Sequence, residues 1–231
     1  MAPGCINLAA LDLEKSVYRV LRLEHLFQLF AKRQNVLVRP TLWDDPFENL
    51  RSQVCPSDGQ PEVFGQCWTF HTSSDAMWRI YSPTYPGNQP NNAVRVRSSV
   101  RLLHDTLKAT CGHGQEAFVG RVRYLPTAKL IKHIKHVAES KEPRSVASAL
   151  LVKRPAFRHE RELRILQVHS RPYETEGLLR YEVDPHHLIT DIMVDPRLSL
   201  SAANQMKSQI RERTGFQGAI RRSLLYALPE L

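Results

Sequence analysis

The sequence predicts an α+β fold, with one compact domain over residues 1–231 and a mixed sheet flanked by helices. Segments with strand periodicity and segments with helix periodicity are interspersed, without the strict strand–helix–strand alternation of a parallel α/β fold. The composition is that of a globular chain with a sizeable core, since 42% of the residues are apolar or aromatic and 24% are charged. We see no internal repeat and no low-complexity linker.

The predicted elements follow one another irregularly. Apolar residues at helical spacing predict helices over 23–30, 75–81, 100–107, 126–137, 145–152 and 203–210. Short apolar or aromatic runs predict strands at 18–21, 36–38, 64–70, 93–96, 117–124, 160–168, 178–183, 188–194 and 224–227. Helix-start signals stand at Ser73-Ser74-Asp75 and at Asp45-Pro46-Phe47-Glu48, which has the letters of a capping box.

Positive charge is concentrated in the second part of the chain. The whole sequence holds 32 Lys and Arg against 23 Asp and Glu, a net charge of +9. Residues 1–90 have a net charge of −1, whereas the basic half, 91–231, has a net charge of +10. Such a distribution attracts polyanions, namely nucleic acid, a nucleotide or an acidic partner. The alternative is a solvated basic face with no ligand.

The helix that begins at Pro126 shows the same bias locally. Its polar side holds Lys129, Lys132, His133 and His136, at the i, i+3, i+4 and i+7 spacing of one helix face. We expect this face to bind nucleic acid. The two histidines look like part of a basic patch rather than a metal site.

Several classes of protein are not supported by the sequence. The 4 cysteines form no CxxC pair and match no zinc module, so no metal is expected and the thiols are expected to be reduced. Apolar runs are too short for a membrane helix, and the N-terminus lacks the basic region of a signal peptide, so a cytoplasmic protein is predicted. The letters ExK at Glu139-Ser140-Lys141 leave a metal-dependent nuclease as an alternative.

The most charged stretch runs from Arg158 to Arg164. On a strand, residues at i, i+2 and i+4 share a face, which would align Glu160, Glu162 and Arg164. Two carboxylates held on a rigid strand can act as a base toward an acceptor or stabilise a developing cation. The alternative is a solvated edge where these side chains form weak ion pairs.

A series of motifs covers essentially the full length of the chain. In order, they are Tyr18-Arg19; Asp44-Asp45-Pro46-Phe47-Glu48; Cys67-Trp68-Thr69; Met77-Trp78 with Tyr81; Lys153, Phe157, Glu160, Glu162 and Arg164; and Arg222-Ser223-Leu224. Their order and spacing resemble those of the bacterial domain of unknown function 2971 family. That resemblance implies no activity.

A second resemblance concerns chemistry. A basic residue on the first strand, a hydroxyl residue on a middle strand and a late ExE are similar to ADP-ribosyltransferases of the Arg–Ser–Glu type. The resemblance implies a split sheet, with NAD as substrate and Arg19 at its phosphate. It also implies that Thr69, or Thr72 or Ser73 in its place, supports the nicotinamide pocket. Glu162 would then be the catalytic glutamate, and Glu160 would activate the acceptor. The chain departs from the pattern because Cys67-Trp68-Thr69 stands where Ser-Thr-Ser is expected.

Other candidate residues have two interpretations each. Trp78 and Tyr81 could stack on a base or on the nicotinamide, whereas core packing is the commoner fate of such a pair. Tyr18, beside Arg19 in the first motif, is a further candidate for NAD binding. Asp44, Asp45 and Glu48 could be catalytic acids, whereas capping accounts for the latter two.

The sequence therefore supports two hypotheses. The first is an NAD-consuming ADP-ribosyltransferase, for example a bacterial toxin or phage-defence effector, acting on a nucleic-acid or protein acceptor. The second is a basic nucleic-acid-binding protein or a metal-dependent nuclease without NAD chemistry. No sequence feature identifies an inhibitory protein partner.

Overall fold

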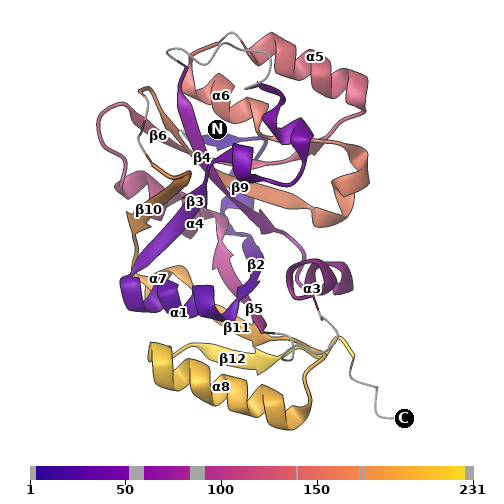
Figure 1. Cartoon of the computed structure of the whole chain (residues 1–231), viewed down its shortest axis with the longest axis vertical. Coiled ribbons are helices and arrows are strands. Elements are labelled where there is room, and N and C mark those ends of the chain that lie inside the picture. The colour runs from indigo at the N-terminus through magenta and orange to yellow at the C-terminus, as the bar shows by residue number, and fades with distance from the viewer. Residues whose placement is uncertain are drawn as a thin grey trace. The chain divides into compact units, whose positions relative to one another are not determined.

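The computed structural model describes residues 4–51, 60–83, 92–138, 140–171, 173 and 175–226. The chain divides into two compact units (Figure 1). Unit 1 comprises residues 1–15, 35–70 and 99–181, and unit 2 comprises residues 16–34, 71–98 and 182–231. Both units combine strands of mixed direction with flanking helices, which confirms the α+β prediction. The assignment of residues 1–231 to a single domain stays a prediction.

Unit 1 contains a mixed group of strands in the order β1-β6-β9-β4-β3-β10, all but β1 of which are labelled in Figure 1. β1 pairs with β6 in parallel, whereas the pairs β6–β9, β9–β4 and β4–β3 are antiparallel. The strands are β1 (Cys5–Ile6), β3 (Gln34–Val38), β4 (Glu62–Thr69), β6 (Gln115–Arg121), β9 (Glu162–His169) and β10 (Leu178–Glu182). β7 (Arg123–Tyr124) and β8 (Val152–Lys153) form a separate parallel pair.

Helices cover the central strands of unit 1. α4 (Val100–Ala109) and α6 (Pro143–Ala149) both contact β6 and β9, and α5 (Thr127–Ala138) packs against α6. The residues Phe118, Leu166 and Val168 share a core cluster with Val146 and Ala147 of α6. All eight residues of β9 are buried, so both faces of this strand are covered. Short 3₁₀ helices span Ala10–Glu14, Pro40–Leu42, Pro46–Asn49 and Pro155–Glu160.

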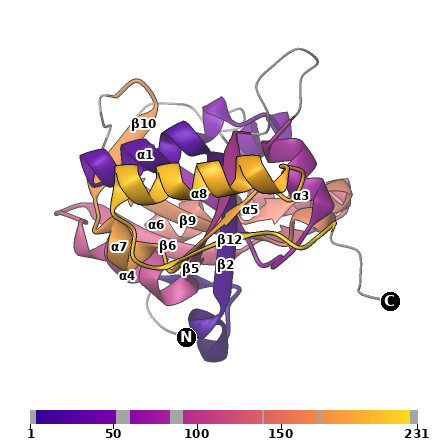
Figure 2. The same ribbon diagram turned by 90° about the horizontal axis from the view of Figure 1, so that it is seen from below.

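Unit 2 contains the strands β2 (Ser16–Arg22), β5 (Ala93–Ser99), β11 (Asp191–Val194) and β12 (Ala219–Arg222), in that order. β5 and β11 are antiparallel, and β11 and β12 are parallel. The helices are α1 (Leu23–Lys32), α3 (Asp75–Tyr81), α7 (Pro185–Leu188) and α8 (Leu200–Thr214). α1 and α8 lie side by side (Figure 2). No helix among the described ranges combines the length and apolar character needed to span a bilayer.

Most predicted elements form where the sequence places them, with two corrections in unit 2. The strand predicted at 188–194 begins only at Asp191, because Asp184 caps a short helix that has Pro185 at its first position. The final strand is Ala219–Arg222 rather than 224–227, because these residues pair with β11. The predicted cap at Ser74 is confirmed, since its hydroxyl accepts the Met77 N–H at 3.4 Å.

Candidate active site

A buried group of charged side chains lies in unit 1 at the beginning of β9. We call it the charge cluster. Its members come from four separate elements and are Glu48, Lys153, Glu160, Glu162 and Arg164. The three carboxylates outnumber the two cations, so the fully ionised cluster has one excess negative charge.

Arg164 is the centre of the charge cluster. It is 0% exposed, and its guanidinium binds Glu162 in a bidentate manner, with Nε to Oε1 at 2.7 Å and Nη2 to Oε2 at 3.0 Å. Nη2 also donates to Glu48, and Nη1 donates to the Leu150 carbonyl at 2.7 Å. The guanidinium carbon lies 4.5 Å from the ring centroid of Trp43. Arg164 is therefore saturated by partners within the protein.

Lys153 joins the carboxylates to one another. Its Nζ lies 2.7 Å from Glu160 Oε2 and 3.4 Å from both Glu162 Oε2 and Glu48 Oε1. The ammonium also lies 4.6 Å from the ring centroid of Phe157. Burial alone would lower the pKa of Lys153, but the carboxylates of Glu162 and Glu48 outweigh burial and raise it. Lys153 is therefore a cation that both candidate catalytic glutamates share.

The structure corrects the placement of Glu160. This residue ends the 3₁₀ helix Pro155–Glu160, and Arg161 then adopts a left-handed conformation with φ of 42° before β9 begins at Glu162. Alternation along a strand consequently does not align Glu160 with Glu162, and the two carboxylates meet through Lys153 instead. Thr69 fixes this geometry, since its hydroxyl donates to the Glu160 carbonyl at 2.6 Å and its backbone pairs with Glu162.

The alternative of a solvated edge is wrong for this strand. β9 lies between β6 and β4, and Glu162 is only 3% exposed. Tyr124 lies beside the cluster, and its hydroxyl accepts the Glu162 N–H at 2.9 Å. Burial raises the pKa of Tyr124 to about 12. The site is therefore enclosed by protein rather than by water.

The two acidic residues of the Asp45–Glu48 segment have different roles, one in capping and one in the charge cluster. Asp45 caps the 3₁₀ helix Pro46–Asn49, because its Oδ1 accepts the Phe47 N–H at 3.1 Å, and it also pairs with Arg154 at 2.9 Å. Glu48 does not complete a capping box, since its carboxylate is directed to Arg164 and Lys153. Asp44 is exposed.

The pKa values of the two late glutamates, Glu160 and Glu162, are shifted in opposite directions. Burial raises the pKa of Glu160, and the Lys153 ammonium only partly offsets this. For Glu162 burial acts in the same direction, but Arg164 and Lys153 dominate and lower the pKa to about 2. Glu162 is thus a permanent anion, whereas Glu160 can take up a proton more readily than an ordinary carboxylate.

Sequence reasoning did not assign a site role to Lys153, Tyr124 or Cys67. The signal for Lys153 was its place in the family motif ahead of Glu160. Cys67 pairs with Arg164 across β4 and β9, and burial together with the nearby Glu162 raises the pKa of its thiol well above the usual range. Nothing in the local sequence around Tyr124 indicated its contact with Glu162.

The other predicted NAD-contacting residues lie in unit 2. Trp78 is 1% exposed and packs against Val20, Met77 and Ala93, so core packing is the role that the structure gives it. Tyr81 is 42% exposed at the end of α3. Tyr18 and Arg19 lie in β2, where Tyr18 is buried and Arg19 is half-buried.

The basic face of α5 is only partly as predicted. Lys129, Lys132 and His136 are exposed, in agreement with the helical spacing. His133 instead is half-buried, with Nε2 3.2 Å from the Ser148 carbonyl of α6. Burial lowers the pKa of His133, so it adds little positive charge near neutral pH. The exposed cations of this face are therefore two lysines, with His136 beside them.

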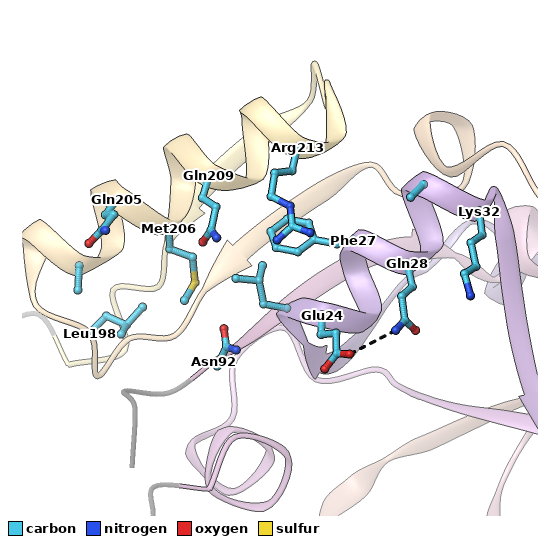
Figure 3. A pocket seen from close by; sticks show the side chains of 13 residues that line it. Glu24, Phe27, Gln28, Lys32, Asn92, Leu198, Gln205, Met206, Gln209 and Arg213 are labelled. Atoms are coloured by element: carbon cyan, nitrogen blue, oxygen red, sulfur yellow. Dashed lines mark hydrogen bonds between the residues drawn. The ribbon is translucent and has the colours of Figure 1, made fainter. Parts of the chain in front are cut away.

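Unit 2 also contains a groove of about 670 Å³ between α1 and α8 (Figure 3). Arg213 lies over the Phe27 ring at 3.8 Å, and Gln28 donates to Glu24 at 3.4 Å along its wall. None of the site residues predicted from the sequence lines this groove. Within the described ranges, no group of three or more His, Cys, Asp or Glu side chains could hold a metal ion.

Comparison with known proteins gives remote structural likenesses. No family model matches the chain, and no curated protein matches its sequence. Solved structures of DarT from Thermus sp. 2.9 are similar over 91% of this chain. The complex with NAD+ has 13% identity, a TM-score of 0.41 and 96% of its own chain covered. The complex with carba-NAD+ has 12% identity and a TM-score of 0.43, with 96% of its own chain covered. The complex with ADP-ribosylated ssDNA has 13% identity and a TM-score of 0.41, with 94% of its own chain covered. Membership of the domain of unknown function 2971 family stays a prediction.

Proposed function

We propose that the chain is an NAD-consuming ADP-ribosyltransferase whose acceptor is a nucleic acid. The observation that supports this best is the pair Glu160 and Glu162. Both carboxylates contact Lys153, and yet their pKa values are shifted in opposite directions. When the pKa values of two neighbouring carboxylates differ, the one with the higher pKa can transfer a proton, and the one with the lower pKa can stabilise positive charge. Transfer of ADP-ribose requires both.

Glu162 would stabilise charge in the first step. The bond between nicotinamide and C1′ of the ribose breaks, the electron pair leaves with nicotinamide, and C1′ gains oxocarbenium character. The fixed negative charge of Glu162 favours that state. Because its oxygens already accept from Arg164 and Lys153, Glu162 acts through its charge rather than by a new hydrogen bond to a ribose hydroxyl.

Glu160 would handle the proton in the second step. The acceptor nucleophile forms its bond to C1′ and releases a proton, which the Glu160 carboxylate takes. Its Oε2 is held by Lys153 at 2.7 Å, whereas Oε1 accepts no hydrogen bond from the residues described. A carboxylate with a raised pKa is also a stronger base than an ordinary one. Thr69 is then a positioning residue, since it holds the Glu160 carbonyl.

The charge of the chain supports a nucleic-acid acceptor. The basic half has a net charge of +10, and the exposed lysines of α5 provide a surface for phosphates. The solved Thermus sp. 2.9 DarT complexes hold NAD+ or ADP-ribosylated ssDNA, so these are the ligands to try first. An enzyme that modifies nucleic acid in this way would act as a toxin or a phage-defence effector.

The test is nicotinamide release from NAD by purified protein, with and without single-stranded DNA. We expect Glu162→Gln to reduce release by about a hundred- to a thousand-fold, the usual effect of removing a group that stabilises transition-state charge. Glu160→Gln should retain release to water and lose transfer to DNA. Glu116→Gln, at an exposed carboxylate of β6, is the matched control and should retain both activities. Equal release by the wild type and Glu162→Gln would refute the proposal.

A nucleic-acid-binding protein without NAD chemistry is the second candidate, favoured by the exposed Lys129 and Lys132. It predicts DNA retention that falls steeply with salt and no nicotinamide release by the wild type under any acceptor condition. A metal-dependent nuclease would instead cleave DNA and lose that activity on chelation. Its proposed ExK motif begins at Glu139, which lies outside the described residues.

A further inference from the structure

Arg95 is a buried arginine of unit 2 without an acidic partner among the residues that the structure describes. It lies in β5 and is only 7% exposed. None of the described carboxylates lies within 4.0 Å of its guanidinium, and its Nε is buried without a hydrogen bond to any described residue. Arg164, the other deeply buried arginine considered above, is by contrast bound by two glutamates.

An arginine in this state destabilises a folded protein. Removing a guanidinium from water is costly, and only a paired or hydrogen-bonded charge recovers that cost. Burial accordingly lowers the pKa of Arg95, although Tyr18 and Asp191 oppose the effect. A charge that the fold leaves unpaired is one that a bound anion can pair.

The surroundings of Arg95 suit an anion. Its guanidinium carbon lies 4.4 Å from the ring centroid of Tyr18, so the aromatic ring packs against the guanidinium. Arg97 lies on the same face of β5 and is opposite Asp191 in the ladder. Asp191 in turn is 3.7 Å from Arg221. Among the described residues, this face of unit 2 thus carries Arg95, Arg97 and Arg221 together with the carboxylate of Asp191.

The position of Tyr18 also bears on the phosphate contact expected at Arg19. Successive residues of a strand point to opposite faces, so Tyr18 and Arg19 of β2 do not share a face. The stack of Arg95 on Tyr18 places the Arg95 guanidinium on the Tyr18 side. The residue that can act together with Tyr18 is therefore Arg95.

We propose that Arg95 and Tyr18 form an anion-binding position within unit 2 that takes a phosphate group of a nucleotide or of pyrophosphate. The planar guanidinium donates two parallel hydrogen bonds to a phosphate, and the Tyr18 ring fixes the orientation of that fork. A bound phosphate would supply a negative charge in direct contact with Arg95, which none of the described carboxylates does within 4.0 Å.

The experiment measures binding of pyrophosphate and of ADP-ribose by calorimetry, with the melting temperature of each ligand-free variant. Arg95→Met removes the charge and keeps most of the volume. We expect it to lose about ten- to a hundred-fold in affinity for both probes, the range for hydrogen bonds to charged groups. Its melting temperature should be equal to or above that of the wild type, because an unpaired buried charge has been removed. Arg33→Met removes the same charge from an exposed residue that pairs with Asp184, and should bind as the wild type does.

Unchanged affinity of Arg95→Met would overturn the inference. So would a loss of affinity with a lowered melting temperature in both Arg95→Met and Arg95→Lys, because Arg95 would then be a structural residue. Neither probe requires turnover, so this result is separate from that for the proposed function. Pyrophosphate binding that depends on Arg95 in a protein without nicotinamide release would refute only the transferase. Normal release with unchanged ADP-ribose binding by Arg95→Met would refute only the anion position.

Discussion

Substitution by glutamine should lower the stability of the protein at Glu162 and should not lower it at Glu160. The folded protein lowers the pKa of Glu162 from 4.5 to about 2. At about 1.4 kcal/mol per pKa unit, the fold favours the ionised form of this side chain by about 3 kcal/mol. Glutamine resembles the neutral acid in shape, so Glu162→Gln should lose about that amount of stability. For a chain of this length the melting temperature should fall by about 6–12 °C.

Glu160→Gln is the matched control, two residues away in the same cluster. Because burial raises the pKa of Glu160, the fold favours its neutral form, and the amide should leave the melting temperature at pH 7 unchanged or higher. The assay is thermal unfolding of both variants and the wild type, by circular dichroism, between pH 7 and pH 3. The stabilisation by Glu162 is present above pH 4.5 and is lost as the pH falls toward 2, so the difference between wild type and Glu162→Gln should shrink in acid.

Two results would refute this reasoning. One is a Glu160→Gln protein that melts as low as Glu162→Gln, which would mean that both carboxylates are held as ions. The other is a Glu162→Gln protein that melts within about 2 °C of the wild type, less than the shift for 1 kcal/mol. The same measurement also sets the temperature at which nicotinamide release by Glu162→Gln can be compared with that of the wild type.

Three further outcomes are expected. Charge reversal at Lys129 and Lys132 should weaken retention of single-stranded DNA and reduce the slope of log affinity against log salt by about 0.7 for each phosphate that the protein no longer neutralises; unchanged retention at low salt would make the face a solvated surface. Tyr124→Phe keeps the ring but removes the acceptor of the Glu162 N–H, so it should lose about 1–3 kcal/mol in chemical denaturation, and no loss would mean that water replaces the hydroxyl. Ser74→Ala removes the cap of α3 and should lose about 1 kcal/mol, whereas Ser74→Asp should not.

The sequence by itself determined the elements and much of the site's membership. Apolar spacing is a local property, so it predicted α1, α4, α5 and α8 and most strands close to their observed bounds. The cap at Ser74 depends on one hydroxyl and a backbone N–H three residues later, and it too could be read locally. The late glutamates were singled out by their spacing together with the resemblance to ADP-ribosyltransferases, and both belong to one buried cluster.

Only the tertiary structure decided how those residues are used. Glu48 looked like a capping residue until the fold brought it to Arg164, 116 positions further along the chain. Glu160 left the strand because Arg161 adopts a left-handed backbone, and the spacing of the letters gives no sign of that turn. The sequence did not indicate that Arg164 is bound by two glutamates whereas Arg95 has no ion-pair partner among the described residues, since both are arginines in apolar strands. The cost of a buried charge depends on which distant side chains pair with it, and that is a property of the packed molecule rather than of any local segment.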